Sequence, residues 1–202
     1  MSENEIREPI QKRSIEKKQK IIKAGFDLIC EKGYYNTNTA EIAKAAGVST
    51  GIVYNYFKDK HDILIAGIEL YASQIFYPML LNTKRINDDN SLEETFRFMI
   101  NNSIKNHKLS QSAHEEIMAM THSDKEIADF FHKYEMLATN DLVQLLTDKG
   151  VNTPNLQEKV HISLGLMDNL CHEIVYHKHS SMNYDVMVDL VIKSIINLLK
   201  ND

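Results

Sequence analysis

The sequence predicts an all-α protein of about nine helices. Its 202 residues include only three prolines and seven glycines, and almost no run alternates between apolar and polar residues as a β-strand does. Apolar residues instead recur at spacings of three and four, between residues that favour the ends of helices. We therefore expect a small three-helix segment near the N-terminus, followed by a larger helical region.

The first four helices are marked by glycine, asparagine and aspartate. Gly33 supplies a C-terminal stop for the first helix, and Asp59 with Asp62 can cap the start of the fourth. Pro78 is expected to kink the last turn of the fourth helix. The predicted ranges are 14–32, 38–46, 50–57 and about 59–81.

Three later helices begin with the pattern S-x-x-E, in which a serine and a glutamate satisfy each other's unpaired amides. The starts at Ser91, Ser112 and Ser123 predict helices over 91–108, 112–121 and 123–149. A helix to about residue 178 opens at Thr153-Pro154, because proline is tolerated in a first turn. The last helix is expected over 183–200.

Charge is unevenly distributed along the chain. The net charge is −5, but residues 1–62 carry +2 and residues 63–202 carry −7. Six basic residues lie within 12–23, where Glu16 is the one acid. A basic first helix on an otherwise acidic chain fits local contact with phosphates, although a lysine-rich helix face can also be merely solvated.

The segment from Thr39 to Phe57 has the pattern of a helix-turn-helix. Ile42 and Ala43 face inward, Gly47 takes the turn where a left-handed backbone is needed, and Ser49 can cap the next helix. Such a unit presents its second helix to the major groove of DNA. A tight helical hairpin with no role in nucleic-acid binding is the alternative.

At this point the sequence resembles a known family. The stretch IIKAGFDLICEKGYYNTNTAEIAKAAGVSTGIVYNYFKDKHDIL is similar to the DNA-binding domain of the TetR/AcrR family of bacterial regulators, over about a quarter of the chain. Gly25 stands where alanine is usual in that family, and Asn38-Thr39 where Thr/Ser then Val is common. The resemblance implies a flexible tail (1–13), a helix-turn-helix domain (14–60) and a helical ligand-binding and dimerisation domain (61–202).

The resemblance, supported by side-chain chemistry, also implies DNA-contacting residues. The start of the second helix can hold a phosphate, the third helix can reach base edges, and lysines after it can neutralise phosphates. For Tyr56 both a phosphate contact and packing into the core stay open. The predicted set is Thr37, Asn38, Thr39, Ser49, Thr50, Gly51, Tyr54, Asn55, Tyr56, Lys58 and Lys60.

The last two helices are apolar over more than one face. A terminal helix of a monomer needs one buried face, so a second apolar face predicts a two-fold dimer that would place two recognition helices on a palindromic operator. Burial within the protomer's own core is the alternative. The predicted interface residues are Leu164, Met167, Cys171, Ile174, Met187, Val191, Ile195 and Leu198.

Helices four to seven are expected to hold a small, largely apolar effector. Aromatic and methionine side chains at helical spacing can line an adaptable pocket, but they can equally form the core. The predicted ligand-binding residues are Tyr77, Phe96, Met99, His114, Met118, His122, Phe131 and Tyr134.

Other functions receive less support. A metal-responsive regulator could use Cys171, His172, Glu173, His177 and His179, but surface histidines are the simpler interpretation, so no metal site and no cofactor are predicted. A DNA-binding protein without a ligand is a further alternative.

An enzyme is not expected. Residues 47–51 match G-x-S-x-G, but they lie in the helix-turn-helix pattern and do not follow a strand, as the nucleophile of that motif does; no H-E-x-x-H or glycine-rich phosphate loop is present. The chain is expected to be cytoplasmic, with two reduced cysteines and no membrane span.

Overall fold

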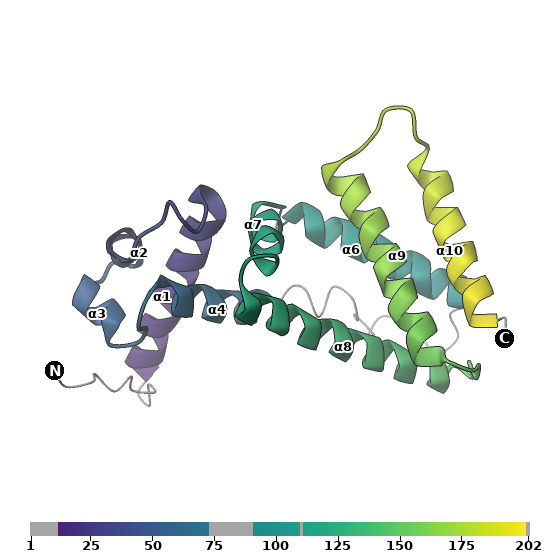
Figure 1. The fold of residues 1–202 in the computed structure, drawn as a ribbon, viewed down its shortest axis with the longest axis horizontal. Helices are drawn as coiled ribbons and strands as arrows, with labels where there is room; N and C mark the ends of the chain where they lie inside the picture. The colour runs from purple at the N-terminus through teal and green to yellow at the C-terminus, as the bar shows by residue number, and fades with distance from the viewer. Residues whose placement is uncertain (1–11, 73–90, 110, 201–202) are drawn as a thin grey trace. The chain divides into compact units, whose positions relative to one another are not determined.

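The computed structural model describes residues 12–72, 91–109 and 111–200, and these residues form nine helices (Figure 1). The all-α prediction is confirmed. The helices are α1 (Lys12–Lys32), α2 (Thr39–Ala46), α3 (Thr50–Tyr54), α4 (Lys60–Tyr71), α6 (Leu92–Leu109), α7 (Gln111–Thr121), α8 (Lys125–Asp148), α9 (Leu156–Tyr176) and α10 (Tyr184–Lys200). No helix in these ranges is both long and apolar enough to cross a membrane.

Packing divides the chain into two compact units. The head unit comprises described residues 12–72 and 111–128, and the body unit comprises 91–109 and 129–200. The head unit therefore contains α1 to α4 with α7 and the first turn of α8. The predicted domain boundary between residues 60 and 61 separates the functions that we expect and stays a prediction. Packing groups α4 and α7 with the first three helices.

The head unit is built on a closely packed apolar core. Ile21 of α1, Ile42 of α2 and Ile63 of α4 are fully buried in it. Gly25 lets these helices approach, because a Cβ atom there would collide with the Ile63 side chain. Gly67 of α4 likewise faces Phe26. The glycine at position 25, a departure from the family pattern, thus matches the tight crossing of α1 and α4.

The body unit has a separate core formed by α6, α8, α9 and α10. Phe96, Leu142 and Ile195 are completely buried within it. Arg97 of α6 also donates to Asp189 of α10, with 2.7 Å between Nη2 and Oδ1. Long amphipathic helices around a shared apolar centre explain why this unit needs few turn-specific residues.

Several predicted helix starts are confirmed. The Ser91 hydroxyl accepts from the Glu94 N–H, and the Glu94 carboxylate accepts from the Ser91 N–H. Asp59 accepts from the N–H groups of His61 and Asp62, and Asn183 accepts from the Val186 N–H.

Two other predicted starts are wrong. Asp124, not Ser123, caps α8, because its Oδ1 accepts from the N–H groups of Glu126 and Ile127. The Ser123 hydroxyl instead donates to the Met120 carbonyl. Similarly, α9 begins at Leu156, so Pro154 lies before the helix and outside its first turn.

Some predictions fall outside the described residues. These are Pro78 with the end of the fourth helix, the polar loop at 82–90, the side chain of Ser112 and most of the predicted flexible tail; α7 itself begins at Gln111, one residue before the predicted start. Lys12 and Arg13, which we placed in that tail, belong to α1.

Candidate DNA-binding interface

The turn between α2 and α3 is fixed by Gly47. This residue has φ 68° and ψ 33°, a left-handed conformation that side chains other than glycine adopt at a cost. Its N–H donates to the carbonyls of Ala43 and Lys44, and the Val48 N–H donates to Ala43 over 3.0 Å. These bonds end α2 and set the direction of the following chain.

Ser49 then starts α3. Its backbone is extended, and its hydroxyl accepts from the Ile52 N–H over 3.4 Å. The helix ends at Tyr54, earlier than the predicted residue 57, although Phe57 still donates its N–H to the Val53 carbonyl. The cap and the turn together hold a short helix against the head unit.

The two faces of α3 differ sharply in burial. Val53 and Phe57 are 1% and 3% exposed and pack in the core with Ile42. Tyr54 is 46% exposed, and Gly51 and Asn55 are also exposed. A Cβ atom at Gly51 would meet no atom within 4 Å. The outer face therefore presents open backbone beside a tyrosine and an amide.

Tyr56 has one of the two roles that the sequence left open, packing into the core. Its ring packs against the head core, and its hydroxyl lies 2.7 Å from the Ser14 hydroxyl of α1. This bond ties the end of the α3 segment to the first turns of α1. A phosphate contact by Tyr56 stays a prediction.

The three residues predicted to hold a phosphate at the start of α2 are not equivalent. The Thr37 side chain is 2% exposed and donates to the Gly33 carbonyl over 3.0 Å, so it stabilises the loop from inside. Asn38 caps α2 and forms a capping box with Glu41. The hydrogen bond from Lys32 to Glu41, followed by the one from Asn38, lowers the pKa of Glu41 and keeps it ionised. Thr39 is half-buried in the first turn.

The two lysines after α3 also differ. Lys58 is exposed, and its backbone N–H donates to Asp62. The Lys60 ammonium donates to the carbonyls of Tyr34 and Thr37 over 2.6 and 2.8 Å, and lies 4.3 Å from the centre of the Tyr34 ring. The Lys60 side chain thus connects α4 to the loop between α1 and α2.

Sequence reasoning missed the residues that join α7 and α8 to these helices. The Tyr34 N–H donates to Glu116 of α7 over 2.7 Å, and His61 Nε2 lies 2.7 Å from Asp124 Oδ2. Burial alone would raise the pKa of Asp124, but hydrogen bonds from Ile127, His61 and Glu126 lower it. Each pair joins residues far apart in sequence, so no local pattern could have revealed it.

Comparison with known proteins agrees with this geometry. The family of bacterial regulatory proteins of the tetR family matches residues 21–66. The chain is 51% identical over 49 residues to the HTH-type transcriptional regulator HbdR of Aromatoleum, covering 24% of this chain and 21% of that protein. It is 32% identical over 97 residues to BetI of Klebsiella pneumoniae, covering 48% and 49%.

The helix-turn-helix within residues 21–66 is of the tetR-family type.

The same fold extends beyond the matched segment. A structure from Mesorhizobium loti described as a TetR-family transcriptional regulator has a TM-score of 0.73 at 20% identity, covering 94% of this chain and 98% of that one. The sequence matches to the relatives named above span at most about half of their lengths. The tetR-type helix-turn-helix is thus shared in sequence, whereas the body unit is shared in fold.

The predicted effector residues are divided between the two units. Phe96 and Met99 pack in the body core, with exposures of 0% and 3%, as the alternative interpretation allowed. Phe131 and Tyr134 are half-buried on α8 in the body unit. Met118 is half-buried and His122 exposed in the head unit. Tyr77 and the His114 side chain lie outside the described residues.

The residues predicted for the dimer interface differ in burial, and the interface itself stays a prediction. Leu164, Met167, Cys171 and Ile195 are at most 7% exposed and pack in the body's own core. Ile174, Met187 and Val191 are half-buried against the same core, and Leu198 is also half-buried. The exposed apolar side chains lie elsewhere on these helices, at Ile162 and Leu166 of α9 and at Val186 and Leu190 of α10.

The metal-donor set weighed from sequence does not come together. The Tyr184 hydroxyl donates a hydrogen bond to the Glu173 carboxylate and accepts one from the His179 N–H. Glu173 is therefore engaged with a tyrosine in this structure. Burial raises the pKa of the Cys171 thiol to about 11, so this sulfur stays protonated. Both cysteines are free, and Cys30 is half-buried.

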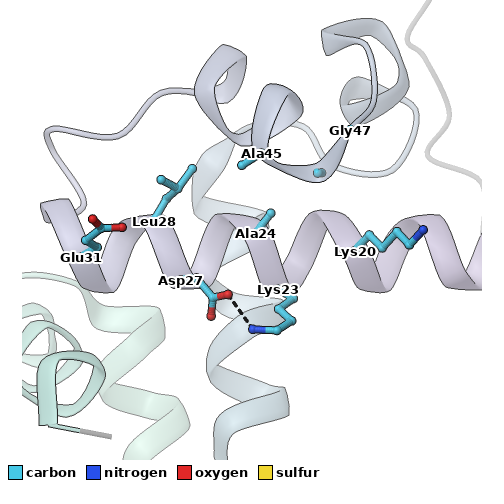
Figure 2. A pocket seen from close by; sticks show the side chains of 9 residues that line it. Lys20, Lys23, Ala24, Asp27, Leu28, Glu31, Ala45 and Gly47 are labelled. Carbon is cyan, nitrogen blue, oxygen red and sulfur yellow. Dashed lines mark hydrogen bonds and ion pairs between the residues drawn. The ribbon is translucent and has the colours of Figure 1, made fainter.

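A surface pocket of about 560 Å³ lies between α1 and the end of α2 (Figure 2). Leu28, Ala45 and Gly47 form part of its lining. Lys23 and Asp27 pair across one turn of α1 at its edge, with 2.6 Å between Nζ and Oδ2. Its lining carries both signs of charge and no recognisable ligand set, so we assign it no ligand.

Proposed function

We propose that this chain is a transcriptional regulator that binds a palindromic operator as a homodimer and is released from it by a small, largely apolar molecule. The observation that carries the proposal is the outer face of α3, where exposed Gly51, Tyr54 and Asn55 stand on a helix fixed from behind by Val53 and Phe57. A short helix with an open, polar face suits entry into a major groove. DNA of the chromosome is in the cytoplasm, which is the location we propose.

We assign the DNA contacts to two groups by exposure. Thr50, Tyr54 and Asn55 would meet base edges, and the exposed Lys58 would neutralise a phosphate. Thr37 and Lys60 act as positioning residues in this proposal, because their side chains are bound to carbonyls of the loop between α1 and α2. Lys60 keeps one of its three N–H donors for a phosphate.

The dimer would form through the exposed apolar face of the last two helices. Ile162 and Leu190 are 54% and 57% exposed, far above what a core residue shows. Gly165, which lies on the exposed side of α9 with open space around its Cα, would allow a second helix to approach. A two-fold interface there would present two α3 helices to successive major grooves.

The body unit is where we place the effector, with Phe131 and Tyr134 as its aromatic contacts. Release requires the effector to bind more tightly to the form of the dimer that does not fit the operator.

Selection of bound fragments from a genomic DNA library tests the proposal. We expect enrichment of one palindromic site, bound with a logarithmic salt slope of about −0.9 for each phosphate contact. Equal recovery of all sequences would contradict operator recognition.

The interface is tested by Leu190→Glu in the full chain. Light scattering should show a shift from dimer to monomer, and affinity for the palindrome should fall while a single half-site is bound as before. Lys193→Glu is the matched control, because it changes the charge at another exposed position of α10 without removing an apolar contact. A dimer that survives Leu190→Glu would place the interface on another face.

A further inference from the structure

Three metal-binding side chains meet within the body unit. His107 extends from α6, while Asp168 and His172 lie one turn apart on α9. His107 Nε2 is 3.9 Å from Asp168 Oδ1, and His172 Nε2 is 3.8 Å from Asp168 Oδ2. All three ligand atoms lie within 4.8 Å of one another.

The hydrogen bond on the other side of the His107 ring determines its tautomer. Nδ1 lies 2.9 Å from the Ser103 carbonyl, which can only accept a hydrogen bond. Nδ1 therefore carries a proton, and in the neutral ring Nε2 is the nitrogen that can bind a metal ion.

The contacts of the His107 ring match those of a metal-binding histidine. Metal-ligating histidines commonly donate their second ring nitrogen to a backbone carbonyl, which orients the ring and makes the free nitrogen a better ligand. Ser103 has that role for His107. His172 packs its ring against His107, with 5.1 Å between the ring centres, so both imidazoles are held at the same place.

The accessibility of the cluster allows an ion to enter. The His107 side chain is only 1% exposed, whereas those of His172 and Asp168 are 27% and 45% exposed. One ligand is therefore rigidly placed in the core, and two lie on the solvent side of it.

We propose that His107, Asp168 and His172 bind one divalent first-row transition-metal ion, for which Zn²⁺ is the best match. Two imidazoles and one carboxylate suit Zn²⁺, Ni²⁺ or Co²⁺, while Ca²⁺ and Mg²⁺ prefer oxygen ligands. Tetrahedral Zn²⁺ with bonds of about 2.0–2.1 Å places its ligands about 3.3 Å apart. The two nitrogen-to-oxygen separations, 3.9 and 3.8 Å to different oxygens of Asp168, exceed that value by about half an ångström, so the more exposed side chains of Asp168 and His172 would move closer to bind the ion.

Three protein ligands leave a fourth position for water or another small ligand. The bound ion would also link α6 to α9 within the body unit. The inference stands on these contacts alone and does not depend on operator binding.

Metal binding by the full chain, purified without a histidine tag and stripped with a chelator, tests this site. Titration with Co²⁺ should give one ion per chain with the visible spectrum of nitrogen and oxygen coordination, and Zn²⁺ should displace it. Asp168→Asn and His172→Gln should each weaken Co²⁺ binding by at least about tenfold, since even second-shell losses cost about 10–100-fold. Zn²⁺ should raise the melting temperature of the natural chain but not of these variants.

His161→Gln is the matched control. His161 also lies on α9, and its Nε2 is 3.7 Å from the Glu135 carboxylate, but no third ligand from the described residues joins this pair. Co²⁺ binding should be unchanged in this variant. Binding that is absent in the natural chain, or equally strong in Asp168→Asn and His172→Gln, would overturn the proposal. Circular dichroism of each metal-free variant shows whether it is folded. The readouts need no DNA, so failure here and failure of operator binding are separate results.

Discussion

The head and body units follow different rules. In the head, individual residues determine individual features of the structure: Gly47 forms the turn, Ser49 starts α3, and Gly25 lets α1 cross α4. In the body, many apolar residues share one core, and no one turn determines its arrangement. The family match to residues 21–66 lies within the head.

This difference has a physical origin in the proposed function. A helix that reads DNA must sit at a fixed angle and depth in the groove, so each residue that positions it is constrained. A body unit needs only an apolar core, a dimer face and a site for its ligand, and many sequences of the right volume provide these. The head is therefore recognisable from sequence, and the body from its fold.

The largest effects are expected from removing one buried aromatic ring from the core of each unit. Phe57→Ala in the head and Phe96→Ala in the body should each lower the free energy of unfolding by about 3–5 kcal/mol. Both rings are at most 3% exposed. Hydrogen exchange should show faster exchange chiefly in the unit that carries the change.

Tyr54→Ala provides the control for the head, since its ring is 46% exposed and its loss should cost at most about 0.5 kcal/mol. Faster exchange throughout the chain in both core variants would mean that the two units unfold as one.

Two glycines of the head separate packing from DNA contact. Gly25→Ala should cost about 1–3 kcal/mol, because the new methyl group meets buried Ile63. In Gly51→Ala the new methyl group would contact no atom, and the free energy of unfolding should rise by about 0.5–1 kcal/mol, since alanine favours a helix. Operator affinity should fall in Gly51→Ala while its melting temperature does not. Unchanged operator affinity in this variant would remove Gly51 from the interface.

The α8 cap gives a smaller effect. Asp124→Ala should cost about 0.5–2 kcal/mol at neutral pH, and Ser123→Ala at most about 0.5 kcal/mol. The pKa of Asp124 is lowered in the folded chain, so its contribution is present above the ordinary value near 3.9 and disappears as pH falls through the folded value. Thermal unfolding from pH 7 to pH 2 should therefore converge for Asp124→Ala and the natural chain. A constant difference across that range would show that the carboxylate charge is unimportant.

Local signals account for what the sequence could predict. The turn and capping residues bond to groups within four positions of themselves in the chain, so the sequence alone was enough to predict their roles. These residues are Gly47, Ser49, Asp59 and Ser91. The error at the start of α8 has the same origin, because Ser123 and Asp124 are adjacent acceptors and only their geometry distinguishes them.

Non-local features could not be predicted in this way. Helices α9 and α10 are apolar around much of their circumference, so their periodicity does not show which face lies inside; Leu164 and Ile195 proved to be core, and Ile162 and Leu190 exposed. The cluster of His107 with Asp168 and His172 joins two helices far apart in sequence. Lys60 has the charge of a phosphate contact, but its position beside two carbonyls is a property of the fold.

The central claim, that the outer face of α3 reads bases, is tested most directly by measuring the affinity of Tyr54→Ala for the selected operator and for a scrambled duplex at one salt concentration. Fluorescence anisotropy should show an operator preference reduced by about 1–3 kcal/mol, with nearly unchanged binding to the scrambled duplex. Lys58→Ala, measured alongside, should weaken both by a similar factor. An unchanged operator preference in Tyr54→Ala, or an equal loss on both duplexes, would contradict the claim.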